Sequence, residues 1–381
     1  MRVLGGVEMS KNRDVVIVGS GIAGSLAALA LGRKGKKVLL VERALQPPAN
    51  GADFLKPSGI KVLKKLGLEE KLHDRGALRR HRIHYYHNGE EIINYNYREH
   101  VFPGYYMIIP YGTQIRLIME RLKAMPNVET VFGTTVTQHK KEGNNLVALT
   151  LSDGRTFQPE LVIASDGARS QIREQLGIAV ERKTYDTLIH MVTSPLTDSV
   201  EKSNRLYMSS TGEIAYIYPL SSTQQRCAIV LPNSSVETIR KMTSNELVQH
   251  MRRFVTESDD VLEQGLDLSQ SHGYAPGHMH ARSYCSGNTL LLGSAILTVH
   301  PFTGQGMNLA IEEVDSLLEA LTEVDAGNRT LPEALEIHAR QRRVVNNKLL
   351  AYSDSLVNSY KDKDQFLANF NFKLHGSSRY F

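Results

Sequence analysis

The chain has 381 residues, of which 41% are hydrophobic and 22% are charged. This balance excludes an intrinsically disordered protein and favours a globular protein with two or three lobes. The formal charge of +5 is a small excess of 45 basic over 40 acidic residues, so a nucleic-acid partner is not expected. This small positive excess is consistent with basic residues on a solvent-exposed helical face, or with electrostatic attraction of an anionic ligand.

No apolar run of about 18 residues occurs, so we expect no membrane span. The first ten residues lack the apolar core and cleavage site of a signal peptide, and we therefore expect a cytoplasmic protein. Cys227 and Cys285 have no CxxC spacing, which predicts two buried thiols rather than a disulfide framework. No metal site is predicted.

The chain opens with a strand, a turn and a helix. Residues 14–18 read DVVIV and predict a buried strand, residues 23–32 predict a helix, and residues 38–41 predict a second strand that ends at Glu42. Strands joined by a helix pair in parallel, so this βαβ unit predicts a doubly wound sheet.

Alternating patterns follow this unit. Residues 82–97 alternate around Asn88-Gly89 and predict a β-hairpin. A helix is expected over 115–122, a second hairpin over 146–157 and a buried strand over 161–164. An antiparallel sheet is predicted between 183 and 272, with strands at 206–208, 214–219 and 227–232 and an amphipathic helix at 244–255.

The last third returns to α/β patterning. Residues 290–292 predict one more buried strand, and residues 306–321 have the apolar spacing of an amphipathic helix. Residues 331–370 are mostly helical in pattern, whereas the last eleven residues show no usable periodicity.

A glycine motif lies between the first strand and the first helix. Its first glycine permits a tight turn, its second allows close approach of a pyrophosphate, and its third lets the helix pack closely. The helix N-terminus supplies free N–H groups, and Glu42 can bind the ribose hydroxyls of an adenosine. FAD and NAD both fit this pattern. The residues assigned to this end of the cofactor are Gly19, Gly21, Ile22, Ala23, Gly24, Glu42 and Arg43.

Two further segments each follow a predicted strand. Residues 164–173 read ASDGARSQIR, and residues 293–308 contain GSA and then HPFTGQGMN. With these motifs the sequence resembles the aromatic-hydroxylase family of FAD-dependent monooxygenases, which has the para-hydroxybenzoate hydroxylase fold. The resemblance covers about residues 13–350. It implies that Gln114, Asp166 and Arg169 lie near FAD. Asp166 can equally cap a helix that begins at Ala168.

The late motif opens a helix at the flavin in this family. The resemblance implies flavin contacts for Gly304, Gly306, Met307 and Asn308, and a catalytic position for His300 and Pro301. Amides at a helix N-terminus stabilise the negative charge of a reduced flavin by about 0.3 to 2 kcal/mol. His300 is either a proton donor or a structural residue of the loop.

The sequence departs from the family pattern at three positions. Ser294 replaces an aspartate that binds the ribityl chain of FAD, and Leu297 replaces a histidine. Loss of a hydrogen bond to a charged group weakens binding by about 10- to 100-fold, so we expect loosely bound FAD. Tyr111 stands where many members carry an arginine. The electron source is therefore left open between NAD(P)H and externally supplied reduced flavin, the latter with a flavin reductase as partner.

Within the family, residues 50–60, 204–207 and 376–379 are most similar to the flavoproteins of alkylquinolone N-oxide biosynthesis, which oxidise an aromatic amine to a hydroxylamine. Asp53, Tyr216 and Tyr218 are the candidate substrate contacts. Their alternative roles are a turn residue for Asp53 and core packing for the two tyrosines.

The resemblance implies a fold in three parts. An FAD-binding doubly wound domain comprises residues 13–80, 105–182 and 273–330. An inserted antiparallel-sheet substrate domain comprises 81–104 and 183–272, and a C-terminal helical region comprises 331–381.

The resemblance also implies the reaction. A monooxygenase of this family inserts one oxygen atom of O2 into an aromatic ring or amine through a flavin C4a-hydroperoxide. A small aromatic substrate from secondary metabolism is expected. One alternative is a flavin-dependent halogenase, which the lack of tryptophan opposes. The other is a non-catalytic relative that has lost FAD and binds a partner or an intermediate, an alternative suggested by Ser294 and Leu297.

Overall fold

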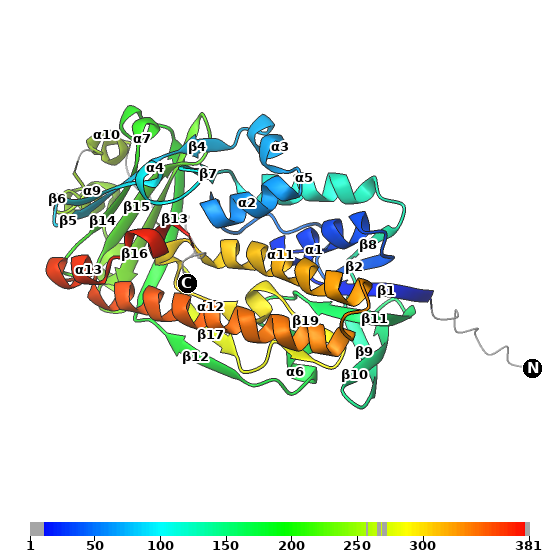
Figure 1. The fold of residues 1–381 in the computed structure, drawn as a ribbon. Coiled ribbons are helices and arrows are strands. Elements are labelled where there is room, and N and C mark those ends of the chain that lie inside the picture. The colour runs from blue at the N-terminus through cyan, green and yellow to red at the C-terminus, as the bar shows by residue number, and fades with distance from the viewer. Residues whose placement is uncertain (1–10, 257, 265–267, 269–272, 378–381) are drawn as a thin grey trace, which may run out of the picture.

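The computed structural model describes residues 11–256, 258–264, 268 and 273–377 (Figure 1). One lobe is built on a mostly parallel sheet, the other on an antiparallel sheet, and a long C-terminal helix runs beside both lobes (Figure 1). This arrangement confirms the predicted α/β fold with an inserted sheet and C-terminal helices. Among the described residues, no helix is long and apolar enough to cross a membrane.

The first lobe contains an eight-stranded sheet with the central order β18-β19-β11-β1-β2-β8, which β10 and β9 extend. Parallel registers place Ile17 beside Ile163 and Ile163 beside Leu290, so three distant chain segments form its centre. The central strands are buried on both faces, which is why the runs Val15–Ile17 and Leu161–Ala164 are continuously apolar. The strands are β1 (Lys11–Val18), β2 (Val38–Glu42), β8 (Val128–Phe132), β9 (Val136–Glu142), β10 (Asn145–Leu151), β11 (Thr156–Ala164), β18 (Cys285–Ser286) and β19 (Thr289–Leu291).

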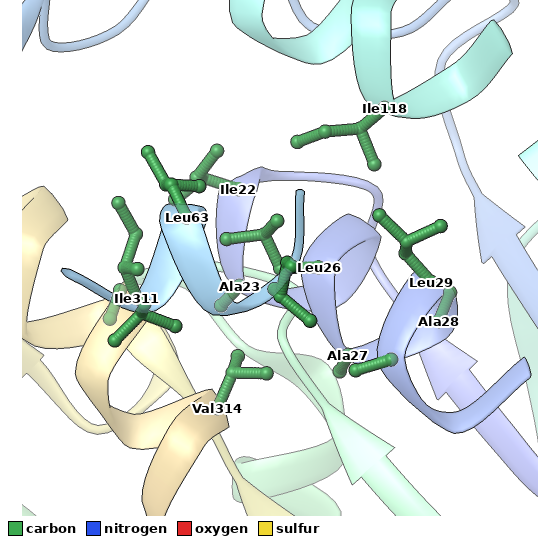
Figure 2. Close-up of a cluster of buried hydrophobic side chains, with 14 of the residues drawn as sticks. Ile22, Ala23, Leu26, Ala27, Ala28, Leu29, Leu63, Ile118, Ile311 and Val314 are labelled. Atoms are coloured by element: carbon green, nitrogen blue, oxygen red, sulfur yellow. The ribbon is translucent and has the colours of Figure 1, made fainter. Parts of the chain in front are cut away.

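Helix α1 (Ile22–Arg33) is buried along almost its whole length. Figure 2 shows its side chains packed against Leu63, Ile118, Ile311 and Val314, which come from three other helices. An alanine-rich helix allows such close packing on all sides. The surrounding helices are α2 (Pro57–Lys65), α5 (Tyr111–Lys123) and α11 (Gly306–Asp325), and the short α3 (Glu69–Asp74) follows α2.

The second lobe contains a six-stranded sheet with the order β13-β16-β15-β14-β5-β6. All its neighbours are antiparallel except β14 and β5, which are parallel. The strands are β5 (Arg82–His87), β6 (Glu90–Asn96), β13 (Thr187–Pro195), β14 (Asn204–Met208), β15 (Ile214–Pro219) and β16 (Gln224–Pro232). The helices of this lobe are α7 (Asp198–Lys202), α8 (Asn233–Arg240), α9 (Ser244–Met251) and α10 (Asp259–Glu263).

Two three-stranded sheets and several short turns of helix connect the lobes. One sheet has the order β3-β7-β4, with β3 (Phe54–Leu55), β7 (Tyr106–Ile108) and β4 (Leu78–Arg80). The other has the order β12-β17-β20, with β12 (Val180–Thr184), β17 (Gly277–Ala281) and β20 (Leu297–Thr298). The short helices are α4 (Tyr97–His100), α6 (Gln171–Gln175), η1 (Gly293–Ala295) and η2 (Pro301–Thr303).

Three helices close the chain, namely α12 (Leu331–Ser359), α13 (Lys363–Asn369) and α14 (Phe372–Gly376). The last of them is fixed to the first lobe by side chains. Gln305 Nε2 donates to the carbonyl of Leu374 at 2.8 Å, and Lys56 Nζ donates to the carbonyl of His375 at 2.5 Å. The imidazole of His375 also bonds to the Tyr85 hydroxyl at 2.5 Å.

Several boundaries differ from the prediction. The helix expected over 244–255 ends at Met251, and a turn follows in which the N–H groups of Phe254 and Val255 both bond to the Met251 carbonyl while their side chains stay buried. The predicted strand 161–164 is the end of the longer β11, and α11 continues to Asp325. Helix α14 lies in the last eleven residues, where no element was predicted. Of residues 376–379, Ser378 and Arg379 lie outside the described residues.

The cysteines also depart in part from expectation. Cys227 is buried, but Cys285 is only half-buried because it stands on the edge strand β18. Both are free thiols.

Candidate active site

Three adjoining cavities run from the edge of the parallel sheet to the face of the antiparallel sheet. Their volumes are about 240, 400 and 960 Å³, and we call them the first, middle and large cavity. Gly21 and Tyr111 border both the first and the middle cavity, while Gly51 and Gly304 border both the middle and the large one. Gly21 and Gly306 line the same middle cavity, so the N-termini of α1 and α11 meet at one cleft.

The first cavity lies at the turn between β1 and α1. Gly19 has φ +100°, and a Cβ there would lie 2.4 Å from the carbonyl oxygen of Ser165, so only glycine fits this turn. The Glu42 carboxylate accepts hydrogen bonds from the backbone N and hydroxyl of Ser20 at 2.8 and 2.9 Å. These bonds hold Glu42 at the cavity wall, next to Arg43.

Asp166 and Arg169 line the opposite wall of the first cavity. One oxygen of Asp166 accepts the backbone N–H groups of Gln171 and Ile172 at 2.8 and 3.3 Å, which satisfies amides at the start of α6. The helix begins at Gln171 rather than at Ala168, because Ser170 is its N-cap. The second oxygen of Asp166 is buried and lacks a hydrogen-bond partner among the described residues. A polar ligand in this cavity would satisfy it.

The middle cavity is bordered by Ile22, Ala23, Ser294, Gly304, Gly306 and Met307. Ser294 is exposed on its wall, in the turn η1. The adjacent Gly293 donates its N–H to the carboxylate of Glu313 at 2.7 Å, and this bond holds the turn η1 in place. Burial raises the pKa of Glu313.

Three residues assigned to the cofactor lie beneath the cavities rather than on their walls. Asn308 accepts from the backbone N of Lys56 at 2.8 Å and donates to the carbonyls of Phe54 and Gly304. Gln114 donates to two backbone carbonyls of the same region and is buried. At Gly24 a Cβ would lie 2.0 Å from the Gly19 carbonyl oxygen. All three hold the shape of the walls.

The large cavity lies between the antiparallel sheet and the loop around η2. Asp53 is buried and accepts a hydrogen bond from Arg226 Nη1 at 2.5 Å and one from the Tyr218 hydroxyl at 3.4 Å. Burial raises the pKa of Asp53, and the Arg226 charge opposes that shift. The cavity walls around the Asp53–Arg226 pair are aromatic and comprise Phe54, Tyr216, Tyr218, Tyr274 and Phe302.

His300 and Pro301 stand where the large cavity meets the loop. His300 is 2% exposed, and its Nδ1 accepts the backbone N–H of Phe302 at 3.2 Å. Burial lowers the pKa of His300 to about 4. The ring is therefore neutral at pH 7, with its proton on Nε2.

Arg226 and Phe54 were missed by sequence reasoning. The signal for Arg226 is the alternation along β16, in which Arg226, Ala228 and Val230 line the cavity while the residues between them pack against helices. A charged residue in such an alternating series points to a polar ligand on that face.

The three cavities fit an extended dinucleotide. Glu42 lies at one end, the amides of α1 and the unpartnered Asp166 oxygen lie along the path, and the glycines at 304 and 306 leave space at the other end. One side chain stands in the path, because the hydroxyl of Tyr111 accepts the backbone N–H of Ile22 at 3.0 Å.

Comparison with known proteins agrees with this fit. Residues 12–353 match the family model described as FAD binding domain. Over 336 residues the chain is 28% identical to 6-methylpretetramide 4-monooxygenase from Streptomyces rimosus, covering 84% of this chain and 78% of that one. It is 25% identical to squalene epoxidase 3 from Arabidopsis thaliana over 85% of this chain, but spans only 63% of that enzyme's length.

Among solved structures, PqsL from P. aeruginosa in complex with 2-aminobenzoylacetate superposes with a TM-score of 0.91 and 34% identity, over 94% of this chain and all of that one. A second PqsL structure, described as a probable FAD-dependent monooxygenase, gives a TM-score of 0.90 and the same identity. With its glycine turn, its cavities and these relatives, the chain belongs to the FAD-binding family of flavin-dependent monooxygenases.

Proposed function

We propose that this monooxygenase transfers one oxygen atom of O2 to the ring or the amine nitrogen of a small aromatic substrate bound in the large cavity. The observation that carries the proposal is the Asp53–Arg226 pair, set among aromatic walls beside the loop at His300. Aromatic walls favour a flat apolar ring, and a few fixed polar groups orient it.

FAD would extend along the three cavities. Glu42 and Arg43 would hold its adenosine, the α1 amides with Asp166 and Arg169 its pyrophosphate, and the segment from Ser294 to Met307 its ribityl and flavin parts. When bound and reduced, FAD supplies two electrons and activates O2 for transfer. The proposal includes loose binding of FAD, because Ser294 offers a weaker hydrogen bond than a carboxylate.

The protein's own groups would then orient the substrate and keep water out. The N-terminal amides of α11 favour negative charge near Gly306. The buried walls around Tyr216 and Tyr218 exclude water and hold the substrate close to the reacting centre. We further propose that the neutral His300 donates a hydrogen bond from Nε2 at this point.

The Asp53–Arg226 pair indicates which class of aromatic substrate the large cavity would bind. Asp53 offers an acceptor for an amine N–H, and Arg226 offers a neighbouring donor for a carbonyl oxygen. An aromatic amine with an adjacent carbonyl group matches both, and 2-aminobenzoylacetate, the molecule bound to PqsL, has this pattern. One oxygen atom enters the product and the other leaves as water, with two electrons from NAD(P)H or from supplied reduced flavin. Both reductants are produced in the cytoplasm, where we propose that the reaction occurs.

The test is oxygenation with 18O2. Purified protein, reduced FAD and 2-aminobenzoylacetate are mixed, and the product is analysed by mass spectrometry. The expected product carries one 18O atom. A parallel reaction with NADPH and oxidised FAD identifies the electron source, with a flavin reductase added in a third arm.

Benzoylacetate, which lacks the amine, is the matched control substrate. We expect it to bind weakly and to leave most of the oxygen as hydrogen peroxide. A protein that quenches FAD fluorescence but oxygenates neither aromatic amines nor phenols would contradict the proposal. Absence of any FAD binding would favour the non-catalytic alternative.

A further inference from the structure

Tyr111 borders all three cavities, between the glycine turn and the loop at Gly304. Its hydroxyl lies 3.0 Å from the backbone N of Ile22, the first residue of α1. A Cβ built on Gly21 would lie 3.6 Å from the same hydroxyl. The phenol therefore covers the backbone that a diphosphate must approach.

Two further contacts fix the ring in this position. The backbone N–H of Tyr111 donates to Asp53 at 3.1 Å, which sets the start of α5. The ring lies directly over Gly51, where a Cβ would be 2.6 Å from ring atoms. A residue with a side chain at position 51 would displace the ring, so the glycine permits this placement.

The phenol and a diphosphate compete for the same donor. Free amides at a helix N-terminus bind anions, and Ile22 N–H is one of them. Burial raises the pKa of Tyr111, so its oxygen accepts this bond as a neutral hydroxyl. A diphosphate would make a stronger, charge-assisted bond there, but only after the ring has moved.

We propose that Tyr111 is a self-blocking residue that sets the affinity of the site for dinucleotides. This inference rests on the proposed use of FAD. The ring must leave the α1 N-terminus before FAD or any other adenosine diphosphate binds. A ligand that fits within the middle and large cavities, such as riboflavin, does not require this movement.

The experiment compares wild type with Tyr111→Ala and Tyr111→Phe by calorimetric titration with FAD, ADP and riboflavin. For Tyr111→Ala we expect the Kd of FAD and of ADP to fall by about 10- to 100-fold, the effect of freeing one donor for a charged group. Tyr111→Phe loses the hydroxyl but keeps the ring, so it should give a smaller decrease. Because Tyr111 also borders the cavities that riboflavin would occupy, the Kd of riboflavin should change less than that of ADP and should not fall in parallel with it.

The matched control is Tyr105→Ala. Tyr105 is a half-buried tyrosine that bonds to Glu69 and borders none of the three cavities, so its loss should change no Kd. Near-UV circular dichroism verifies that each variant is folded, and Tyr111→Phe serves if the alanine variant is not.

The inference is overturned if FAD and ADP bind the Tyr111 variants no more tightly than wild type, including the case in which ADP binds none of them. It is also overturned if the Kd of riboflavin falls to the same extent as the Kd of ADP. ADP carries no flavin, so its titration tests Tyr111 even if no substrate is oxygenated. If the Kd values of the Tyr111 variants equal those of wild type but 18O is incorporated into the product, this inference fails while the proposed function stands.

Discussion

Asp53 and Arg226 are 173 positions apart in the sequence, yet the carboxylate and the guanidinium meet at 2.5 Å on the wall of the large cavity. Their side chains are 3% and 20% exposed. A buried ion pair contributes little net stability, but an unpaired partner left behind is costly. The pair therefore has a structural consequence that can be measured apart from any activity.

Replacing Arg226 should destabilise the protein. Arg226→Met leaves the Asp53 carboxylate buried without its cation, and we expect the free energy of unfolding to fall by about 3 kcal/mol. Adding Asp53→Asn should recover part of this loss, because the amide carries no charge. Urea denaturation measures both values.

The control is Arg75→Met, which removes an exposed pair with Glu120. Because this pair is exposed to solvent, its loss should lower the free energy of unfolding far less than the loss of Arg226 does. If Arg75→Met and Arg226→Met lower the free energy of unfolding equally, the buried Asp53 carboxylate does not require Arg226 as its partner.

Stability should fall in mild acid, in part because of His300. Its pKa of about 4 in the folded protein lies below the ordinary 6.5, so the unfolded chain binds more protons between these values. Stability then rises with pH through this window, by at most about 1.4 kcal/mol per pH unit for one histidine. His280 and His338 have the same shift and add to the slope.

The variant His300→Asn isolates this contribution. The asparagine oxygen can accept the Phe302 N–H in place of Nδ1, while the titrating group is lost. Urea denaturation from pH 4 to 8 should show a shallower slope below pH 6.5 and parallel curves above pH 7. An unchanged slope would mean that His300 is protonated equally in both states.

Ser294→Asp should tighten FAD binding. The residue is exposed on the wall of the middle cavity, so a carboxylate there can accept a hydrogen bond from a ribityl hydroxyl. We expect the Kd of FAD to decrease by about 10- to 100-fold in fluorescence titrations. Ser283→Asp adds the same charge at an exposed position that lines none of the three cavities, and should leave the Kd unchanged. Equal Kd values for wild type and Ser294→Asp would rule out this role of the position.

Lys56 should make stability depend on pH on the alkaline side. Burial lowers its pKa to about 7, whereas the ordinary value is 10.5, so the unfolded chain again binds more protons between these values. Stability should rise from pH 7.5 to 9.5, by at most about 1.4 kcal/mol per pH unit. Higher pH is avoided because buried tyrosines with raised pKa values oppose the trend.

Lys56→Met keeps the length of the side chain and removes its charge. The carbonyl of His375 retains a bond from Gln305 Nε2 at 3.2 Å, and the His375 imidazole retains its bond to Tyr85, so α14 stays anchored. Denaturation curves of this variant should lose most of the alkaline rise. If stability still rises with pH as steeply as in wild type, a group other than Lys56 causes the rise.

The glycine turn and the helices around it were predictable because their signals are local. Six consecutive residues, Gly19 to Gly24, encode the turn, and regular apolar spacing encodes α11. Individual strands were also found from alternation. The parallel pairing of β14 with β5 was not, because no local pattern records which strand lies beside another.

The parts of the site that escaped prediction depend on distant partners. Arg226 was recognisable as polar in an alternating strand, but its partner Asp53 lies on a loop of the other lobe. The position of the Tyr111 ring depends on Gly51 and on the helix that begins at Ile22. The Lys56–His375 contact joins residues 319 positions apart. Sequence patterns give residue types and faces, and tertiary packing decides which of them meet.

The central strands of the parallel sheet have a consequence for how this protein reaches its native state. Ile17, Ile163 and Leu290 are neighbours across β1, β11 and β19, so closing this sheet requires loops of more than a hundred residues. Such high contact order slows folding, since chain entropy is lost before the distant pairings form. We expect refolding from urea to be slow and to populate an intermediate in which the adjacent strands β14, β15 and β16 have paired first.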